Sequence, residues 1–208
     1  MKHYLLLIPL LALCSCAGTK TSFDASKAED SSASNSNSQS TESIHEIPPR
    51  APILVAYFSA TGNTKPLAEY AADRYNCDLF EIVPMQEYTT ADIDYSNSNC
   101  RALKEQADSD SRPEIKYEVD AMYNYSAIIL GYPIWAMKAP RIIFSFLEAY
   151  DFEGKQILPF CTSGSTDISA TIDELKAAAP KATWLDGKRF AAGTDKATFT
   201  KWLPTFSF

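Results

Sequence analysis

Three nearly continuous apolar runs constrain the fold of this chain more than any other feature. They cover residues 53–59 (ILVAYFS), 126–132 (SAIILGY) and 156–161 (QILPFC). Runs of this length and character are typical of strands that are buried on both faces of a parallel sheet. A further strand is predicted at residues 78–83 (DLFEIV) and a weak one at residues 182–185, which brings the expected sheet to five strands.

Helical periodicity appears between these strands. The predicted helices cover residues 65–75, 140–150, 168–179 and 195–202. Residues 84–125 are less regular, and one short helix is expected near residues 100–107. Strands that alternate with helices predict an α/β fold with a doubly wound parallel sheet.

Both histidines of the chain, His3 and His45, precede the predicted sheet. From residue 51 onward no histidine is present to serve as a general base, as the partner of a nucleophilic Ser or Cys, or as a metal ligand. Chemistry in this region must therefore rest on carboxylates, lysines, hydroxyls, thiols, backbone amides or a bound cofactor.

The region from residue 51 to residue 208 is acidic, with 15 basic and 21 acidic side chains and a net charge of −6. A nucleic-acid partner requires a basic surface, so the charge argues against one. A single phosphate group held by backbone amides is still compatible with this charge.

The chain begins with a short positive stretch followed by an apolar run over residues 4–13, which is too short to span a bilayer. This order is typical of a signal peptide. The run ends in Leu13-Cys14-Ser15-Cys16, which resembles the lipobox of bacterial lipoproteins. The resemblance implies that residues 1–15 are removed, that Cys16 is lipidated, and that the protein is exported and lipid-anchored to the bacterial cell envelope. The alternative is an ordinary secretory leader whose cysteines are incidental.

The segment after Cys16 has the composition of a tether. Residues 17–50 contain nine serines and only one aromatic residue, Phe23. Such a segment buries too little apolar surface to offset the entropy of ordering, so we expect residues 16–50 to be a disordered link to the membrane. A cleaved or unimportant tail is the alternative. The folded domain is expected to cover residues 51–208.

A group of small polar residues follows the first predicted strand. Residues 59–64 read Ser-Ala-Thr-Gly-Asn-Thr, and the next helix begins at about Lys65. Hydroxyls, a flexible glycine and the free N–H groups of a helix N-terminus together suit a phosphate group. The segment is neither a Walker A loop nor a dinucleotide fingerprint, because both spacings are absent. A Ser/Thr-rich turn with a helix cap is the alternative.

The motif Ser-x-Thr-Gly-Asn-Thr after a strand resembles the FMN-phosphate loop of flavodoxins. Two further loops strengthen the resemblance, since residues 131–137 (GYPIWAM) follow the third strand and residues 162–165 (TSGS) follow the fourth. In flavodoxins these loops hold the isoalloxazine ring. The resemblance covers essentially all of residues 51–208.

The resemblance implies a three-layer flavodoxin-like sandwich with strand order 2-1-3-4-5 and a non-covalently bound FMN. The implied cofactor contacts are Ser59, Ala60, Thr61, Gly62, Asn63 and Thr64 in the first loop, Pro133, Ile134, Trp135, Ala136 and Met137 in the second, and Thr162, Ser163, Gly164 and Ser165 in the third. The first loop would hold the phosphate, Trp135 would stack on the ring, and the third loop would contact its polar edge. The flavin performs the redox step, so we expect no catalytic side chain and no metal.

The chain departs from the simplest flavodoxins in its third loop, which lacks an aromatic residue. One ring face would then be open, or covered by Tyr88, Tyr95 or another loop residue. An electron carrier that serves a redox partner protein or a small acceptor is the first hypothesis. An FMN-dependent reductase of quinone-like acceptors is the second, and a flavodoxin-like binding module without cofactor is the third.

Cysteines and acidic residues give weaker signals. Cys77, Cys100 and Cys161 are an odd number, so no disulfide framework is implied, although one Cys77–Cys100 bridge is compatible with an oxidising compartment. Cys161 lacks the Cys-x5-Arg spacing of a small phosphatase and is interpreted as a buried apolar residue. The aspartates of residues 92–110 are interpreted as turn formers rather than as ligands of a weak calcium site.

Overall fold

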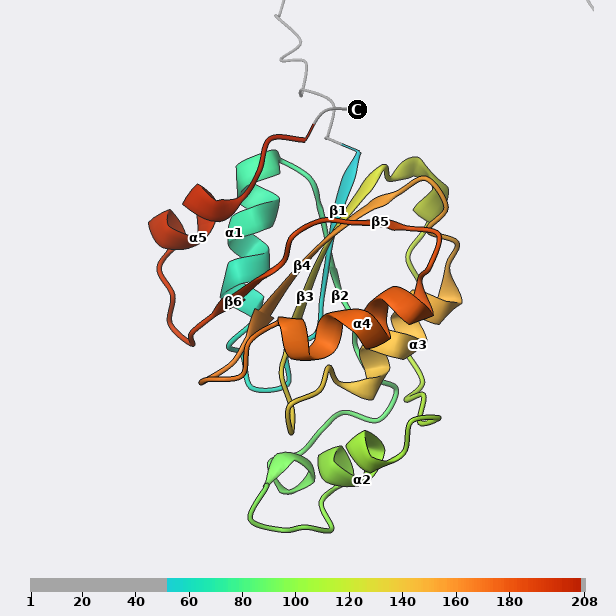
Figure 1. Cartoon of the computed structure of the whole chain (residues 1–208), viewed down its shortest axis with the longest axis vertical. Helices are drawn as coiled ribbons and strands as arrows, with labels where there is room; N and C mark the ends of the chain where they lie inside the picture. Colours follow the sequence, from blue (N-terminus) through green and yellow to red (C-terminus); the bar gives the residue numbers. More distant parts are fainter. Residues whose placement is uncertain (1–51, 207–208) are drawn as a thin grey trace, which may run out of the picture. The chain divides into compact units, whose positions relative to one another are not determined.

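The computed structural model of the chain describes residues 52–206. The predicted signal peptide, the lipidation site Cys16 and the tether lie outside the described residues. The described part consists of a parallel sheet between two layers of helices (Figure 1). None of the helices among residues 52–206 is long and apolar enough to span a membrane.

The sheet has the order β2-β1-β3-β4-β5, and every pairing is parallel. The strands are β1 (Ile53–Tyr57), β2 (Asp78–Glu81), β3 (Ala127–Pro133), β4 (Gln156–Thr162), β5 (Thr183–Trp184) and β6 (Lys188–Phe190). The helices are α1 (Lys65–Tyr75), α2 (Arg101–Ala107), α3 (Arg141–Ala149), α4 (Ser169–Ala178) and α5 (Lys196–Trp202). The predicted fold class and strand order are confirmed.

Strand β6 was not predicted, and it forms the second half of an interrupted edge strand. Both β5 and β6 pair with β4, on either side of Pro159. The backbone carbonyl of Ile157 in β4 accepts a hydrogen bond from the Leu185 N–H, so Ile157 faces the edge strand. Because alternate residues of β4 face this neighbour, the next one is Pro159, which has no N–H to donate. Gly187 fits closely against this proline, because a Cβ atom on Gly187 would lie 2.7 Å from Pro159 Cγ. The edge strand is therefore interrupted where its neighbour cannot donate.

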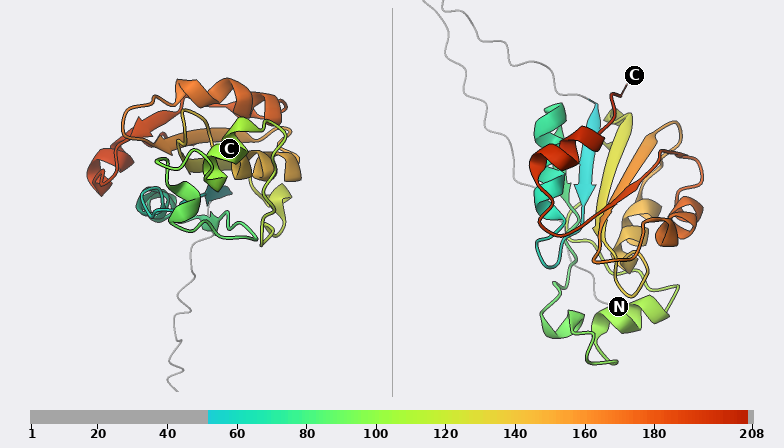
Figure 2. Two further views of the ribbon diagram at one scale, coloured as in Figure 1. Left: turned by 90° about the horizontal axis from the view of Figure 1, so that it is seen from below. Right: turned by 60° about the vertical axis from the view of Figure 1, so that its left-hand side comes forward.

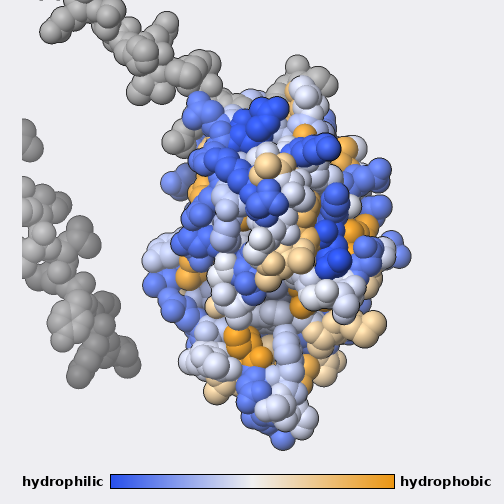
Figure 3. Space-filling model, turned by 90° about the vertical axis from the view of Figure 1, so that its left-hand side faces the viewer, coloured by the Kyte–Doolittle hydropathy of each residue, from blue (hydrophilic) through white to orange (hydrophobic). Residues whose placement is uncertain are grey.

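Burial on both faces explains why the strand sequences are continuously apolar. In β1, Leu54 belongs to the core beneath α3 and α4, whereas Val55 belongs to the core beneath α1 and α5. Figure 2 shows these helix layers on opposite sides of the sheet. Hydrophilic side chains dominate the upper part of the surface that Figure 3 shows, on the side of α1 and α5. The helices thus have one apolar face and one solvated face.

Residues 84–125 form an excursion between β2 and β3. It contains α2 and two short 3₁₀ helices, η1 (Ala91–Ile93) and η2 (Met122–Asn124). An antiparallel bridge between Pro84 and Ile115 joins the two ends of its outer part. The α2 region lies beyond the carboxyl ends of the strands (Figures 1 and 2), which is the edge where open α/β sheets bind ligands.

Candidate functional site

The first loop folds around the hydroxyl of Ser59. Ser59 Oγ accepts hydrogen bonds from the backbone N–H groups of Thr64 (3.2 Å) and Lys65 (3.3 Å), at the start of α1. Gly62 has φ of +80°, a left-handed conformation that favours glycine. The N-cap residue Thr64 makes no side-chain hydrogen bond to the helix, and the first turn contains no acidic residue. The positive end of its dipole is therefore not neutralised by a carboxylate in that turn.

A buried pair of hydroxyls ties the first loop to the third. Thr64 Oγ1 and Thr162 Oγ1 lie 2.8 Å apart, and the two residues are 1% and 5% exposed. Within the same first loop, Asn63 Nδ2 donates to Thr61 Oγ1 at 3.1 Å. The Thr64 hydroxyl is thus engaged within the protein, and Thr61 and Asn63 are the exposed polar side chains of this loop.

The second loop is a tight two-residue turn. Trp135 and Lys138 exchange backbone hydrogen bonds of 2.9 Å, and the central residues Ala136 and Met137 have φ of 45° and 66°. Positive φ at both central positions is typical of a type I′ turn, where Asn-Gly is preferred, so this backbone carries local strain. Ile134 N–H donates to Thr162 O at 3.0 Å, which places the second loop beside the third.

Trp135 is held within the protein by two other aromatic rings. Its ring packs edge-to-face against Phe58 (5.3 Å between centroids) and Tyr88 (4.9 Å). Tyr88 is itself anchored, because its hydroxyl donates to Glu105 and the guanidinium of Arg101 lies 4.0 Å from its ring centroid. Only 6% of the Trp135 surface is exposed. Most of its surface is therefore used in packing, and a small part faces the adjacent cavity.

The third loop is held by the neighbouring edge strand. Arg189 Nη1 donates to Ser163 O at 2.8 Å and to Gly164 O at 3.3 Å. Ser163 N–H donates to Phe190 O at 3.1 Å. These bonds fix the backbone of a loop that has only small side chains, and the sequence analysis gave no role to Arg189.

Residues from all three loops line one cavity of about 250 Å³. Its lining comprises Thr61, Asn63, Pro133, Ile134, Trp135, Thr162, Ser163 and Gly164, together with Ile93, Tyr95 and Ala192. The structure thus brings together eight of the residues that the resemblance implicated. It places Ser59 and Ala60 on a neighbouring cavity, and Gly62, Thr64, Ala136, Met137 and Ser165 line neither of these two cavities.

Ile93 and Ala192 are the lining residues that the sequence did not predict, and Tyr95 was one of the candidates for covering a ring face. Ile93 and Tyr95 come from the excursion around η1, and Ala192 follows β6. Tyr95 is 48% exposed, and burial of its hydroxyl raises its pKa to about 12. The excursion therefore adds an uncharged aromatic side chain to the cavity wall.

The remaining sequence candidates have structural explanations. Cys77, Cys100 and Cys161 are all buried, and Cys100 and Cys161 are free thiols. Burial raises the pKa of Cys161 to about 12, which keeps it protonated at neutral pH. The carboxylates of Asp92 and Asp94 accept hydrogen bonds from Thr89 and Ser96 in local turns. Among residues 52–206, no cluster of His, Cys, Asp and Glu is arranged to hold a metal ion.

The lining matches the chemistry of a flavin mononucleotide. A phosphate group suits the N-terminus of α1, where the first turn has backbone donors and no carboxylate. A flat ring suits a cavity that combines Pro133, Ile134 and Tyr95 with the backbone of the third loop. The residues present therefore fit such a cofactor.

Comparison with known proteins identifies the family. The family model described as Flavodoxin matches residues 52–206. A solved protein from Bacteroides eggerthii, provisionally described as a flavoprotein, is 40% identical over 72% of this chain and 94% of its own, with a TM-score of 0.68. A second solved protein, from Bacteroides uniformis and described in the same way, is 39% identical over 74% of this chain and 98% of its own, with a TM-score of 0.70.

A more distant structure shares the fold. A flavoprotein from Lactobacillus acidophilus, solved in complex with FMN, is 23% identical over 74% of this chain and 99% of its own, with a TM-score of 0.57. None of the curated proteins matches the chain. Because the family model matches the whole described region and a relative with 40% identity covers most of the chain, this protein belongs to the flavodoxin family.

Proposed function

We propose that this protein is an exported, lipid-anchored flavodoxin that binds FMN non-covalently and transfers electrons to or from a redox partner. The observation that carries the proposal is the convergence of three loops on one cavity, next to the N-terminus of α1. The FMN complex of the Lactobacillus acidophilus protein supports the choice of cofactor. The flavin, when bound, supplies the redox chemistry.

The residues of the chain would bind, orient and shield the cofactor. The first loop would hold the phosphate with the side chains of Thr61 and Asn63 and with backbone N–H groups that now donate to Ser59. Pro133, Ile134 and Trp135 would exclude water from one side of the ring. Backbone groups of the third loop, held by Arg189, would contact its polar edge.

The acidic charge of the domain would tune the flavin. Residues 51–208 carry a net charge of −6, and negative charge near a flavin opposes the formation of its anionic reduced form. We expect the bound FMN to have a lower midpoint potential than free FMN. A potentiometric titration of the purified protein measures this directly, and a potential equal to or above that of free FMN contradicts the charge argument.

Tyr95 would cover part of the ring that the third loop leaves open. Thr162, Ser163 and Gly164 contribute no aromatic surface to the cavity, whereas Tyr95 is half exposed on its wall. The small side chains of the third loop also favour the second function, an FMN-dependent reductase of quinone-like acceptors, because a ring face with little cover is accessible to a substrate. Steady-state turnover with a quinone would distinguish the reductase from the simple carrier.

The test of the site compares FMN affinity among variants. Tyr95→Ala should weaken FMN binding by about 1–3 kcal/mol, the range found for stacking of bases on aromatic side chains. The matched control is Tyr123→Ala, since Tyr123 is 81% exposed and does not line the cavity. Trp135 is tested as Trp135→Phe, because truncation to Ala would also remove its packing against Phe58 and Tyr88. If the Tyr95→Ala and Tyr123→Ala variants lose FMN affinity equally, Tyr95 does not belong to the site.

The proposed lipid anchor has its own test. In a bacterial host, metabolic labelling with a fatty acid should mark the wild-type chain and not the Cys16→Ser variant, while Cys14→Ser serves as the control. Labelling that survives Cys16→Ser would refute the assignment of Cys16.

A further inference from the structure

A second cavity lies on the other side of the aromatic group that supports Trp135. It has a volume of about 350 Å³ and is lined by residues that follow β1, by the end of β2 and by the excursion. Phe58 and Tyr88 line this cavity and also contact Trp135, which lines the candidate flavin cavity. Ser59 and Ala60 of the first loop also line the second cavity, so it adjoins the proposed phosphate site, whereas Glu81, Glu87, Lys116 and Tyr117 line it and do not line the flavin cavity.

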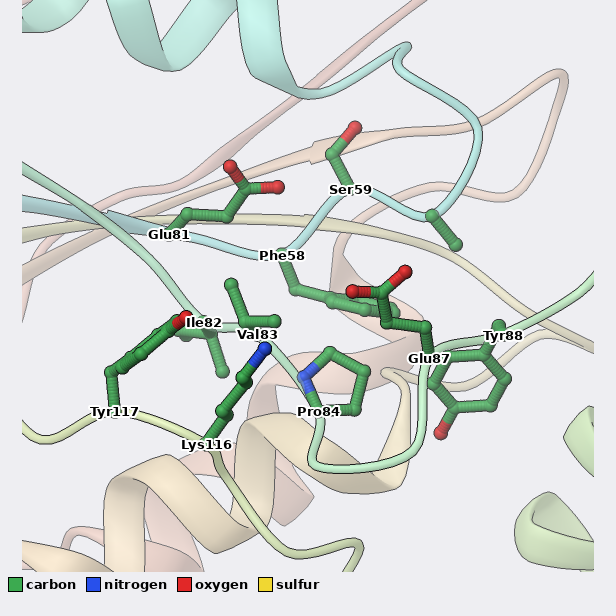
Figure 4. Close-up of a pocket in the computed structure, with 11 residues that line it drawn as sticks. Phe58, Ser59, Glu81, Ile82, Val83, Pro84, Glu87, Tyr88, Lys116 and Tyr117 are labelled. Atoms are coloured by element: carbon green, nitrogen blue, oxygen red, sulfur yellow. The ribbon is translucent and has the colours of Figure 1, made fainter.

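Buried apolar residues lie beneath this cavity and fix its position. Phe58, Ile82 and Pro84 are buried side chains of its lining. Lys116 N–H donates to Val83 O at 2.8 Å, which holds the segment carrying Lys116 against the end of β2. Figure 4 shows side chains from these separate segments arranged around one hollow. The volume lies near the lower end of the range for small-molecule sites.

Charges of both signs line the cavity. The Glu81 carboxylate already accepts a hydrogen bond from Tyr57 (2.9 Å) and lies 3.9 Å from Lys65 Nζ. Within residues 52–206, neither the Glu87 carboxylate nor the Lys116 ammonium has an ion pair or a hydrogen bond of its own. Lys116 Nζ lies 5.3 Å from the ring centroid of Tyr117, which also lines the cavity.

The charge pattern selects among ligand classes. A simple anion would be attracted by Lys116 and repelled by Glu81 and Glu87, and a simple cation would be attracted by the carboxylates and repelled by Lys116. A molecule that carries both an ammonium and a carboxylate group satisfies Glu87 and Lys116 together. The rings of Tyr88 and Tyr117, which line the cavity and are partly exposed, add a preference for an aromatic body.

We propose that this cavity binds a small zwitterion with an apolar body, of the class of aromatic α-amino acids. Lys116 pairs with the carboxylate of the ligand, Glu87 pairs with its ammonium group, and the apolar body of the ligand packs against the rings of Tyr88 and Tyr117. No bond is made or broken in this step, so the site is a binding site.

The experiment is isothermal titration calorimetry of the purified protein with three probes. L-phenylalanine carries both charges, phenylethylamine lacks the carboxylate, and N-acetyl-L-phenylalanine lacks the ammonium. We expect L-phenylalanine to bind, and each of the other probes to bind about fivefold more weakly, which is the effect of losing one partly solvated ion pair. Absence of L-phenylalanine binding, or equal affinity for the three probes, would overturn the proposal.

Substitutions at the two exposed residues Lys116 and Glu87 test whether these residues pair with the charged groups of the ligand. Lys116→Gln should remove the preference for L-phenylalanine over phenylethylamine, and Glu87→Gln should remove its preference over N-acetyl-L-phenylalanine. Lys176→Gln, on the exposed surface of α4, is the control and should leave both preferences intact. FMN binding by the two variants should equal that of the wild type, since neither residue lines the flavin cavity. If either variant keeps the wild-type preference, the corresponding pairing is wrong.

Discussion

The hydroxyl pair between Thr64 and Thr162 offers a quantitative test of how the first and third loops are held together. The two oxygens lie 2.8 Å apart, and both residues are almost completely buried. Replacing one threonine with the isosteric valine removes one hydroxyl and leaves the other buried without this partner. An unsatisfied buried hydroxyl costs about 1–3 kcal/mol. Each single variant, Thr64→Val or Thr162→Val, should therefore lose about that much unfolding free energy.

The double variant should behave differently from the sum of the singles. When both hydroxyls are replaced by methyl groups of similar shape, no polar group is left unpaired, so the net cost should fall to roughly 0–1 kcal/mol. The double-mutant cycle should thus give a coupling energy of at least about 1 kcal/mol. This value is specific to a direct contact between the two side chains.

Urea unfolding without FMN measures these energies. With a slope of about 2 kcal/mol/M, a loss of 2 kcal/mol lowers the midpoint by about 1 M while the slope stays constant. Thr183→Val, at an exposed threonine of β5, is the control and should change stability by less than about 0.5 kcal/mol. Additive single effects would refute the hydroxyl contact and, with it, the described link between the two loops.

Three further predictions concern stability. Gly131→Ala should lower the unfolding free energy by about 1–3 kcal/mol through overpacking, because the new Cβ would lie 2.3 Å from Phe160 Cζ. Gly164→Ala, which has open space around the new Cβ, should be nearly neutral in the same thermal or urea unfolding assay. Burial raises the pKa of Cys161 from 9.0 to about 12. Between these pH values the thiol is protonated in the folded state and ionised in the unfolded state, so the unfolding free energy should fall by up to about 1.4 kcal/mol for each unit that the pH rises. Cys161→Ala should show a shallower loss over that range, and parallel pH profiles would contradict the assignment. Arg189→Met should cost about 1 kcal/mol and increase hydrogen exchange at Ser163, because the donor that fixes the third loop is lost; unchanged exchange would show that Arg189 does not hold this loop.

Sequence periodicity predicted the main elements because their burial pattern is local. The continuous apolar character of β1, β3 and β4 follows from burial on both faces, which a parallel sheet imposes on every residue of a central strand. Strand β6 escaped prediction because Lys188 and Arg189 are two of its three residues. Its pairing depends on Pro159 in another strand, and a sequence window around β6 contains no such information.

The candidate site shows a similar division between local motifs and tertiary packing. The loop motifs predicted eight residues of the cavity because each follows the carboxyl end of a strand. The ring contact between Trp135 and Tyr88 depends on the folding of the excursion, which the irregular sequence of residues 84–125 does not reveal. The same excursion brings Ile93 and Tyr95 to the cavity. Their placement depends on long-range pairing such as the Pro84–Ile115 bridge.

The proposed function requires that the cavity formed by the three loops binds FMN. Its most direct test is a titration of the purified protein, freed of any copurified flavin, with FMN while flavin fluorescence and visible absorption are recorded. We predict saturable binding of one FMN per chain with a changed absorption spectrum, weakened by Tyr95→Ala and unaffected by Tyr123→Ala. A protein that remains colourless and leaves the FMN spectrum and fluorescence unchanged would contradict the claim.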